Sequence, residues 1–277
     1  MYEILERRRL VPNLHLLRVR APETARACRP GQFIMVMIGP DGERVPLSIA
    51  DWDAVEGSVT AVFLIVGTST QKLARLRAGD RLHVCAGPLG KPSEIAGFGT
   101  VLLVAGCYGI AALYPAARAL RQAGNRLVLL ADVKAGHLLY WEDRYRNLCD
   151  RIVVASRDPG APFQEFASHA VSNVAAKEAS LGRVLVSGCA YLLAAVSEAT
   201  RPLGLRTIVS LNPIMVDGTG MCGACRCSIG GNTRFACVDG PDFDGHQVDW
   251  PELFRRRAAY LDDEVRSLCR FEKESLP

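Results

Sequence analysis

The chain has 277 residues, of which 49% are hydrophobic, and this is enough apolar material for two domains of ordinary size and a short appendage. Its 33 basic and 29 acidic residues leave a formal net charge of +4 without a dense basic stripe, so we expect no nucleic-acid partner. The first nine residues mix both charges and lack the apolar core of a signal peptide, which predicts a cytoplasmic protein.

The first third of the chain, up to about Pro92, reads as short strands separated by turn residues. Examples are the strands Phe33–Ile38 and Val59–Val66 and the turn Pro40–Gly42. Turns at this spacing are typical of a small antiparallel barrel. We expect one short helix in this part, over Thr70–Leu76.

Beyond the barrel, apolar strands alternate with helical segments, and a domain boundary is expected within residues 93–99. Such alternation predicts a parallel sheet with helices on both faces. The uncharged run Thr100–Ala117 is divided by Gly106, Gly109 and Pro115, so no membrane span is expected. The predicted elements are Val101–Ala105, Ala111–Ala123, Arg126–Leu130, Trp141–Asn147, Arg151–Ala155 and Arg183–Val186, with a helix after the last strand.

The C-terminal part has a different character. From Pro213 to about Gly245 the sequence is rich in glycine and cysteine, and one amphipathic helix is predicted over Pro251–Leu268.

The chain contains ten cysteines, which in a cytoplasmic protein indicate metal or redox chemistry rather than a disulfide framework. Four of them, Cys222, Cys225, Cys227 and Cys237, lie in one short segment. The others are scattered, as is typical of packed thiols, and are Cys28, Cys85, Cys107, Cys149, Cys189 and Cys269.

The cysteine segment favours a [2Fe-2S] site. Plant-type sites use a C-x4-C-x2-C run with a distant fourth cysteine. Cys222 and Cys225 match the C-x2-C pair, Cys237 is the distant ligand, and Asp217 stands where the first cysteine is expected. A carboxylate is a possible though harder iron ligand, and Cys227 is the competing candidate.

Two alternatives stand beside the iron–sulfur interpretation. A structural zinc site would use the four cysteines of this segment, but the second C-x2-C pair typical of zinc is missing. Reduced structural thiols are the other alternative. Gly218, Gly220 and Gly223 favour the cluster, since they suit a loop that wraps closely around it and directs amides at sulfur.

These residues carry a family resemblance. Residues 210–225, SLNPIMVDGTGMCGAC, and residues 235–245, FACVDGPDFDG, resemble the small (alpha) subunit of NADH-dependent reduced ferredoxin:NADP oxidoreductase. They also resemble the electron-transfer subunit of dihydroorotate dehydrogenase, whose pattern has cysteine at the position of Asp217. The resemblance covers almost the whole chain and implies that Asp217, Cys222, Cys225 and Cys237 hold the cluster.

The barrel contains residues that resemble the family's flavin signature. Gly31-Gln32-Phe33 is followed by an arginine and, four residues later, a serine, where the wider superfamily has a spacing of three. An arginine can neutralise a pyrophosphate, and a serine hydroxyl can bond the flavin ring or a phosphate. Residues 63–70, FLIVGTST, lead into the short helix, and the N-terminus of a helix can bind a phosphate group. The predicted FAD residues are Arg44, Val45, Pro46, Leu47, Ser48, Leu64, Val66, Gly67, Ser69 and Thr70.

Read singly, the motif R-x-P-L-S is more often an ordinary strand, and its combination with the second loop and the cysteine segment favours FAD.

The predicted nicotinamide site is a degraded version of the family pattern. Gly106 and Gly109 would permit close approach of a pyrophosphate, but Cys107 and Tyr108 crowd the turn. Asp132, after the second strand of this domain, would repel a 2′-phosphate, so NAD(H) is favoured over NADP(H).

Cys107 and Cys189 lie at equivalent strand ends. They are either a redox or metal-binding pair or two small packed turn residues.

Together these observations predict an α/β plus β protein. The expected domains are an FAD-binding β-barrel (1–95), a parallel-sheet NAD(P)-binding-like domain (96–210), a [2Fe-2S] segment (211–250) and a C-terminal helix (251–277). The predicted role is electron transfer between NAD(P)H or a partner flavoprotein and ferredoxin-type carriers.

The resemblance further implies a larger flavoprotein partner with iron–sulfur clusters and a place in an electron-bifurcating assembly. The alternatives are an independent NAD(P)H:ferredoxin reductase and a non-catalytic wire or scaffold subunit that has lost nicotinamide binding.

Overall fold

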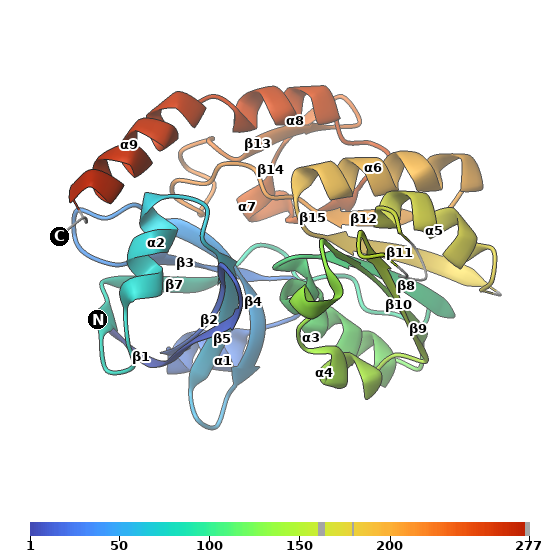
Figure 1. The fold of residues 1–277 in the computed structure, drawn as a ribbon, viewed down its shortest axis with the longest axis horizontal. Helices are drawn as coiled ribbons and strands as arrows, with labels where there is room; N and C mark the ends of the chain where they lie inside the picture. Colours follow the sequence, from blue (N-terminus) through green and yellow to red (C-terminus); the bar gives the residue numbers. More distant parts are fainter. Residues whose placement is uncertain (160–163, 179, 275–277) are drawn as a thin grey trace.

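The computed structural model describes residues 1–159, 164–178 and 180–274. It contains two large sheets that lie side by side, and the C-terminal part of the chain runs across both of them (Figure 1).

The N-terminal sheet is antiparallel and nearly closed into a barrel, as predicted. Its seven strands follow the order β6-β1-β2-β5-β4-β3-β7. Apolar side chains such as Ile4, Leu17, Ile34 and Val59 point inward and form its core. The bounds are β1 Tyr2–Val11, β2 Leu14–Arg20, β3 Phe33–Met37, β4 Val45–Asp53, β5 Ser58–Leu64, β6 Arg81–Leu82 and β7 Val84–Leu89, with helix α1 over Pro22–Ala27.

Helix α2 of the barrel spans Thr68–Arg75 and begins two residues before the predicted start. The reason lies in the turn that precedes it. The hydroxyl of Thr70 accepts hydrogen bonds from the amides of Val66 (3.0 Å) and Gly67 (3.1 Å) and closes the turn. The helix therefore begins at Thr68, and Thr70 is the third residue of its first turn.

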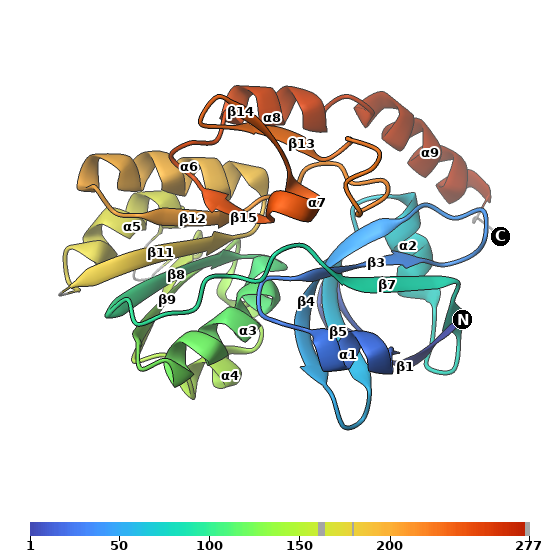
Figure 2. The same cartoon turned by 180° about the vertical axis from the view of Figure 1, so that it is seen from behind.

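The second sheet has six strands in the order β10-β9-β8-β11-β12-β15. It is parallel except for β15, which runs antiparallel to β12. Helices α3 and α4 cover one face and α5 and α6 the other (Figure 2). The bounds are β8 Thr100–Gly106, α3 Gly109–Gln122, β9 Arg126–Val133, α4 Glu142–Arg146, β10 Arg151–Ser156, α5 Ala167–Ala175, β11 Leu181–Ser187, α6 Ala190–Thr200, β12 Thr207–Ser210 and β15 Asp242–Asp244.

Helices on both faces explain the uninterrupted apolar run of the central strand. Every residue of β8 is buried, as expected for a strand with no face toward water. The run Thr100–Ala117 divides into β8 and the start of α3, as predicted. Within the described ranges, no helix is long and apolar enough to cross a bilayer.

The two sheets are tied together by a carboxylate of the barrel. Asp51, on β4, pairs with Arg118 of α3 (3.0 Å) and with Arg144 of α4 (3.2 Å). Arg144 also lies over the ring of Trp141, 4.2 Å from its centroid. One barrel side chain thus joins two helices of the second domain.

The C-terminal part begins with a segment that we call the cysteine loop, residues 211–225. It leads into the hairpin β13 (Arg226–Ile229) and β14 (Asn232–Phe235) and the short helix α7 (Ala236–Asp239). The chain then returns to the second sheet as β15 and ends in α8 (Trp250–Arg257) and α9 (Leu261–Glu274).

The prediction of one helix over Pro251–Leu268 is wrong, because the chain turns at residues 258–260 and forms two helices. The two helices pack on different parts of the molecule. In α8, the ring of Phe254 stacks on Tyr191 of α6. In α9, Phe271 lies under Lys72 and Arg75 of α2, on the barrel. A straight helix would not reach both sites.

Candidate cofactor sites

The cysteine loop rests directly on the barrel. Gly218 and Gly220 adopt left-handed backbone conformations, with φ of +86° and +89°. A Cβ on Gly218 would lie 2.8 Å from Met35 of β3, and one on Gly220 would lie 2.6 Å from Val238. Both positions require glycine, as the sequence suggested, because conformation and space each exclude a side chain.

Two of the four predicted ligands meet at the base of this loop. The sulfur atoms of Cys225 and Cys237 lie 3.2 Å apart and both side chains are buried. This exceeds the length of a disulfide bond, about 2.05 Å. The amide of Cys237 points at the sulfur of Cys225, 3.5 Å away.

The surroundings of Cys237 suit a metal thiolate. Burial, followed by the hydrogen bond with Cys225, raises the pKa of the Cys237 thiol to about 12, while the amide of Gly220 has the opposite effect. A buried thiol of this kind ionises only when a cation compensates its charge. Paired thiols and amides directed at sulfur therefore fit an iron–sulfur cluster.

The other two predicted ligands lie farther out on the same loop. Cys222 is exposed. Asp217 accepts hydrogen bonds from the hydroxyl and the amide (3.0 Å) of Thr219, which lower its pKa, and nearby Arg44 adds to this effect. In the part of the chain that the structure describes, no three Cys, His, Asp or Glu side chains converge closely enough to hold a metal ion. The structure thus brings Cys225 and Cys237 into contact, and Cys222 lies near enough to help raise the pKa of the Cys237 thiol.

Cys227, the competing ligand, has a different environment. It lies on β13 opposite Arg234 of β14, and its thiol points at the Arg234 carbonyl at 3.6 Å. Burial raises its pKa to about 12. Its position on a regular hairpin strand favours a packed thiol.

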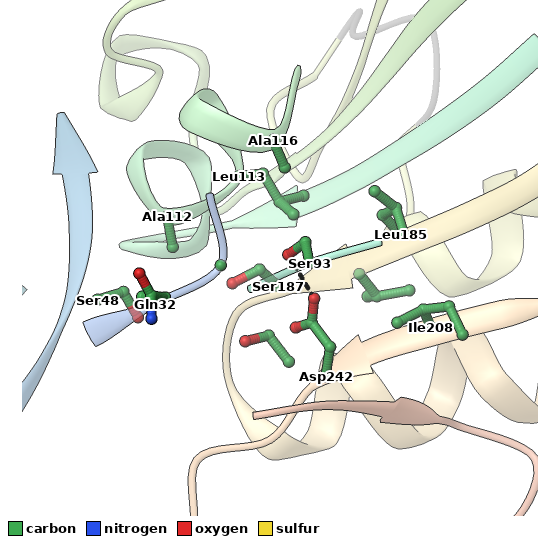
Figure 3. Close-up of a pocket in the computed structure, with 13 residues that line it drawn as sticks. Gln32, Ser48, Ser93, Ala112, Leu113, Ala116, Leu185, Ser187, Ile208 and Asp242 are labelled. Carbon is green, nitrogen blue, oxygen red and sulfur yellow. Dashed lines mark hydrogen bonds between the residues drawn. The ribbon is translucent and has the colours of Figure 1, made fainter. Parts of the chain in front are cut away.

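The first half of the predicted flavin site lies along β4, whose residue Ser48 faces the second domain. Residues Val45 to Ser48 pair with β3, and Ser48 stands opposite Phe33. Ser48 lines a cavity of about 20 Å³, room for about one water molecule, together with Gln32 and Asp242. Figure 3 shows Asp242 hydrogen-bonded to Ser93, with Ser48 and Gln32 to one side. Arg44 is exposed in the loop before β4.

The second half of the predicted flavin site, at the start of α2, borders a larger cavity. This cavity measures about 470 Å³ and lies between the β3–β4 loop, α2 and α9. Its volume is in the range of ligand pockets, about 300 to 1,000 Å³. Val45 and Ser69 are the predicted residues that line it, and Lys72 adds a positive charge.

Several predicted flavin residues do not face this cavity or already have a partner within the protein. The hydroxyl of Thr70 is used within its own turn, where it also donates to the Gly67 carbonyl (3.0 Å). Ser69 donates a hydrogen bond to Glu43. Leu64 is half-buried, and Val66 is 72% exposed beside the turn. Thr68 and Ser267, which line the cavity, were missed because one precedes the predicted helix and the other lies far along the chain.

The predicted nicotinamide turn is filled by the protein itself. A Cβ on Gly109 would lie 2.0 Å from the Ser187 carbonyl oxygen, and one on Gly106 would lie 2.8 Å from Leu192. The two glycines therefore allow β8 and α3 to pack on the turn after β11. The amide of Ala111, in the first turn of α3, is already bonded to the hydroxyl of Tyr140 (3.0 Å).

Tyr108 occupies a central place in this turn. Its hydroxyl donates to the Gly188 carbonyl (2.8 Å), and the amide of Asn212 donates to the Tyr108 hydroxyl. Arg257 of α8 in turn donates to Asn212. Sequence reasoning noted that Tyr108 crowds the turn, but it had no signal for Asn212 or Arg257, which are distant in sequence.

Asp132 is placed at the end of β9, as expected, but it is not a free negative charge. Arg157 pairs with it at 2.8 Å and also lies over the ring of Phe166. The argument that Asp132 alone repels a 2′-phosphate is weakened, since an arginine stands beside it. The preference for NAD(H) stays a prediction.

A flavoprotein-type barrel beside a parallel sheet, with paired buried thiols in a glycine-rich loop packed on the barrel, defines an electron-transfer reductase of the flavin and iron–sulfur class. Comparison with known proteins agrees. A family model described as the iron-sulfur cluster binding domain of dihydroorotate dehydrogenase B matches residues 212–249.

The electron transfer subunit homolog of dihydroorotate dehydrogenase B (NAD⁺) from Thermotoga maritima is 38% identical, over 98% of this chain and 95% of that protein. A chain in the structure of NADH-dependent reduced ferredoxin–NADP oxidoreductase, studied for flavin-based electron bifurcation, is 36% identical with a TM-score of 0.91, and 98% of each chain is covered. A Neisseria gonorrhoeae ferredoxin NADP⁺ reductase shares the fold at 17% identity, with a TM-score of 0.60 over 74% of this chain and 91% of that one.

The chain belongs to the family of dihydroorotate dehydrogenase B electron transfer subunits. The predicted family, fold class and role, a flavin and iron–sulfur electron-transfer subunit of an oxidoreductase, are therefore confirmed. The assignment of individual residues to the cofactors stays a prediction.

Proposed function

We propose that this chain carries FAD in its barrel and one [2Fe-2S] cluster in its cysteine loop, and passes electrons between NAD(P)H or a partner flavoprotein and a ferredoxin-type carrier. Asp217, Cys222, Cys225 and Cys237 hold the cluster in this proposal. When bound, FAD supplies exchange of electron pairs and of single electrons, and the cluster supplies exchange of single electrons.

The observation that carries the proposal is the packing of the cysteine loop beside the predicted flavin segment. Gly218 of the cysteine loop packs against Met35 and Leu89 of the barrel, and Met35 pairs with Pro46 of the flavin segment. Asp217, at the cluster end, is close enough to Arg44, at the flavin end, for the arginine to lower the aspartate pKa. These contacts support the proposal that the two sites are neighbours on the barrel.

The side chains of the flavin site have separate roles in this proposal. The Arg44 guanidinium and the first amides of α2 would neutralise the pyrophosphate. The hydroxyl of Ser48 and the backbone of β4 would bond and orient the ring. The turn closed by Thr70 holds the start of α2 in place. The chain supplies position and charge, and its cofactors supply the redox chemistry.

The proposed ligands come from one short stretch of chain and from α7. Cys225 and Cys237 are adjacent, and Cys222 is exposed on the same loop, near enough to influence the Cys237 thiol. The left-handed glycines at positions 218, 220 and 223 let the loop follow its tight path between these residues.

A second candidate function is a wire subunit that does not bind nicotinamide. It is favoured by the turn at residues 106–109, where Tyr108 and the Ser187–Gly188 backbone occupy the space next to α3. In this case a larger flavoprotein partner with iron–sulfur clusters supplies the electrons. Such a partner, a ferredoxin-type acceptor and a place in a bifurcating assembly belong to the proposal, as family membership suggests.

The test is an anaerobic titration of the purified chain with NADH and, separately, with NADPH, followed by visible absorption and EPR. Bleaching of the flavin band with appearance of a [2Fe-2S] signal supports the adaptor function. Reduction by dithionite alone supports the wire. A purified chain without flavin and iron, after expression under conditions that load a known iron–sulfur protein, contradicts both.

A matched pair of variants tests the ligand set. Asp217→Cys should keep the cluster and change its EPR spectrum, because a softer thiolate replaces a carboxylate. Asp217→Ala should lower the iron content. Equal iron content and identical spectra in both variants would show that position 217 is not a ligand. In that case Cys227 becomes the fourth ligand to test.

A further inference from the structure

The turns that follow β8 and β11 bring two cysteines to neighbouring positions. The strands are parallel neighbours, and their last paired residues are Ala105 and Ser187. Cys107 and Cys189 lie two residues further along the chain, beyond the ends of both strands, and the backbone of Cys107 is left-handed (φ +52°). Their separation is therefore set by the contact between the two turns and not by strand register. A disulfide between them requires Cα atoms about 4.4 to 6.8 Å apart.

The two turns are fixed against each other by direct backbone contact. A Cβ on Gly188 would lie 3.1 Å from the carbonyl oxygen of Gly106, and one on Gly109 would lie 2.0 Å from that of Ser187. The hydroxyl of Tyr108 bonds the Gly188 carbonyl at 2.8 Å, and Asn212 donates to the same carbonyl at 3.0 Å. These contacts keep the turns from moving apart.

Accessibility separates this pair from the other neighbouring thiols. Cys189 is exposed and Cys107 is half-buried, and both are free. Cys28 and Cys85 also influence each other, but both are buried inside the barrel. Burial raises the pKa of Cys107, and Cys189 contributes to this rise. The exposed Cys189 is thus the thiol that a small molecule meets first.

We propose that Cys107 and Cys189 are a redox-active dithiol pair that exchanges with small disulfides at the carboxyl edge of the second sheet. The Cys189 thiolate attacks one sulfur of the small disulfide, forms a mixed disulfide and releases one thiol. The Cys107 thiolate then attacks the Cys189 sulfur, forms the internal disulfide and releases the second thiol. The small disulfide is the oxidant and takes up both electrons and both protons as two thiols.

The proposal does not depend on FAD, on the cluster or on nicotinamide binding, because it rests on the positions and the exposure of the two thiols. The test uses the full chain with its bound cofactors and glutathione disulfide as the probe. After incubation, free thiols are alkylated and the peptides are mapped by mass spectrometry. The expected result is a peptide pair joined through Cys107 and Cys189, with loss of both alkylation sites and their return on addition of dithiothreitol.

Three variants make the result specific. Cys107→Ser should stop at the mixed disulfide on Cys189, since the resolving thiol is gone. Cys189→Ser should show no modification of Cys107. Cys269→Ser, which removes an exposed cysteine on α9, should leave the joined peptide unchanged.

Absence of the joined peptide in the parent chain, with an unchanged far-ultraviolet circular dichroism spectrum, would overturn the proposal. Equal mixed disulfide on Cys189 in the parent and in Cys107→Ser would overturn it as well, because Cys107 would then not resolve the intermediate.

Discussion

At the scale of single residues, Cys225 and Cys227 are two positions apart and lie in different surroundings. Cys225 faces Cys237 at 3.2 Å, whereas Cys227 bonds a carbonyl of its own hairpin. We therefore expect Cys225→Ser to reduce bound iron to background and Cys227→Ser to retain it. Iron analysis and visible absorption measure the difference. Equal iron loss in both variants, with both folded, would assign Cys227 to the cluster.

Asp242 is a second residue whose surroundings predict a measurable effect. It is half-buried and bonded to Ser93 (2.5 Å) and Ser210, and loss of hydration raises its pKa above the ordinary value of 3.8. Its folded-state pKa thus exceeds its unfolded pKa. The resulting stabilisation is complete below pH 3.8 and is lost as the pH rises through the folded pKa.

The variant Asp242→Asn isolates this effect, because the amide has a similar shape and does not ionise. We expect the free energy of unfolding of the parent, minus that of Asp242→Asn, to fall as the pH rises from the acid side. Urea unfolding at several pH values measures it. A difference that does not change with pH would mean that the pKa of Asp242 is not raised in the folded protein.

At the scale of elements, α9 is held to the barrel by few contacts. The Phe271 ring lies 4.4 Å from the guanidinium of Arg75 and 5.4 Å from the amine of Lys72, and Thr68 meets Ser267 at 3.0 Å. Phe271→Ala should weaken docking by about 1 kcal/mol or less, as for an exposed cation–π contact. The measurement is limited proteolysis, with faster cleavage expected at the turn of residues 258–260.

Val265→Ala is the matched control for that experiment, because Val265 lies on the same helix and is 52% exposed. It should leave the cleavage rate unchanged. The same rate for all three proteins would show that Phe271 does not hold α9.

At the scale of the whole molecule, Asp51 joins the barrel to α3 and α4. Replacing it by asparagine removes the charge from two ion pairs and leaves both arginines in place. Because all three side chains are partly exposed, we expect a loss of about 1 kcal/mol that shrinks at high salt. Calorimetry at low and high salt measures this loss. Glu142→Gln, which breaks an exposed pair within α4, is the control and should have less effect.

The C-terminal segment also acts at this scale, since it touches both domains. Lys91, after the last barrel strand, bonds the Gly240 carbonyl through its amide (2.6 Å), and β15 joins the second sheet. The C-terminal segment therefore helps to hold the two domains beside each other.

Local sequence patterns were sufficient for the barrel, the parallel sheet and the cysteine segment. Each depends on features read over a few residues, namely turn spacing, apolar runs such as Val101–Ala105, and the C-x2-C pair beside glycines. The same patterns predicted that Gly218 and Gly220 serve a tightly wrapped loop around a cluster. Their left-handed backbone fits a tight loop, whereas the contacts that exclude a side chain, with Met35 and Val238, were not predicted.

Only the tertiary structure decided which residues meet across long distances in sequence. It brought Arg44 within electrostatic range of Asp217, joined Tyr108 to Asn212, paired Asp132 with Arg157 and bent the C-terminal helix at residues 258–260. The physical reason is the same in each case. Helix and strand periodicity reports which face of an element is buried, whereas the partner that covers this face is chosen by packing of the whole chain.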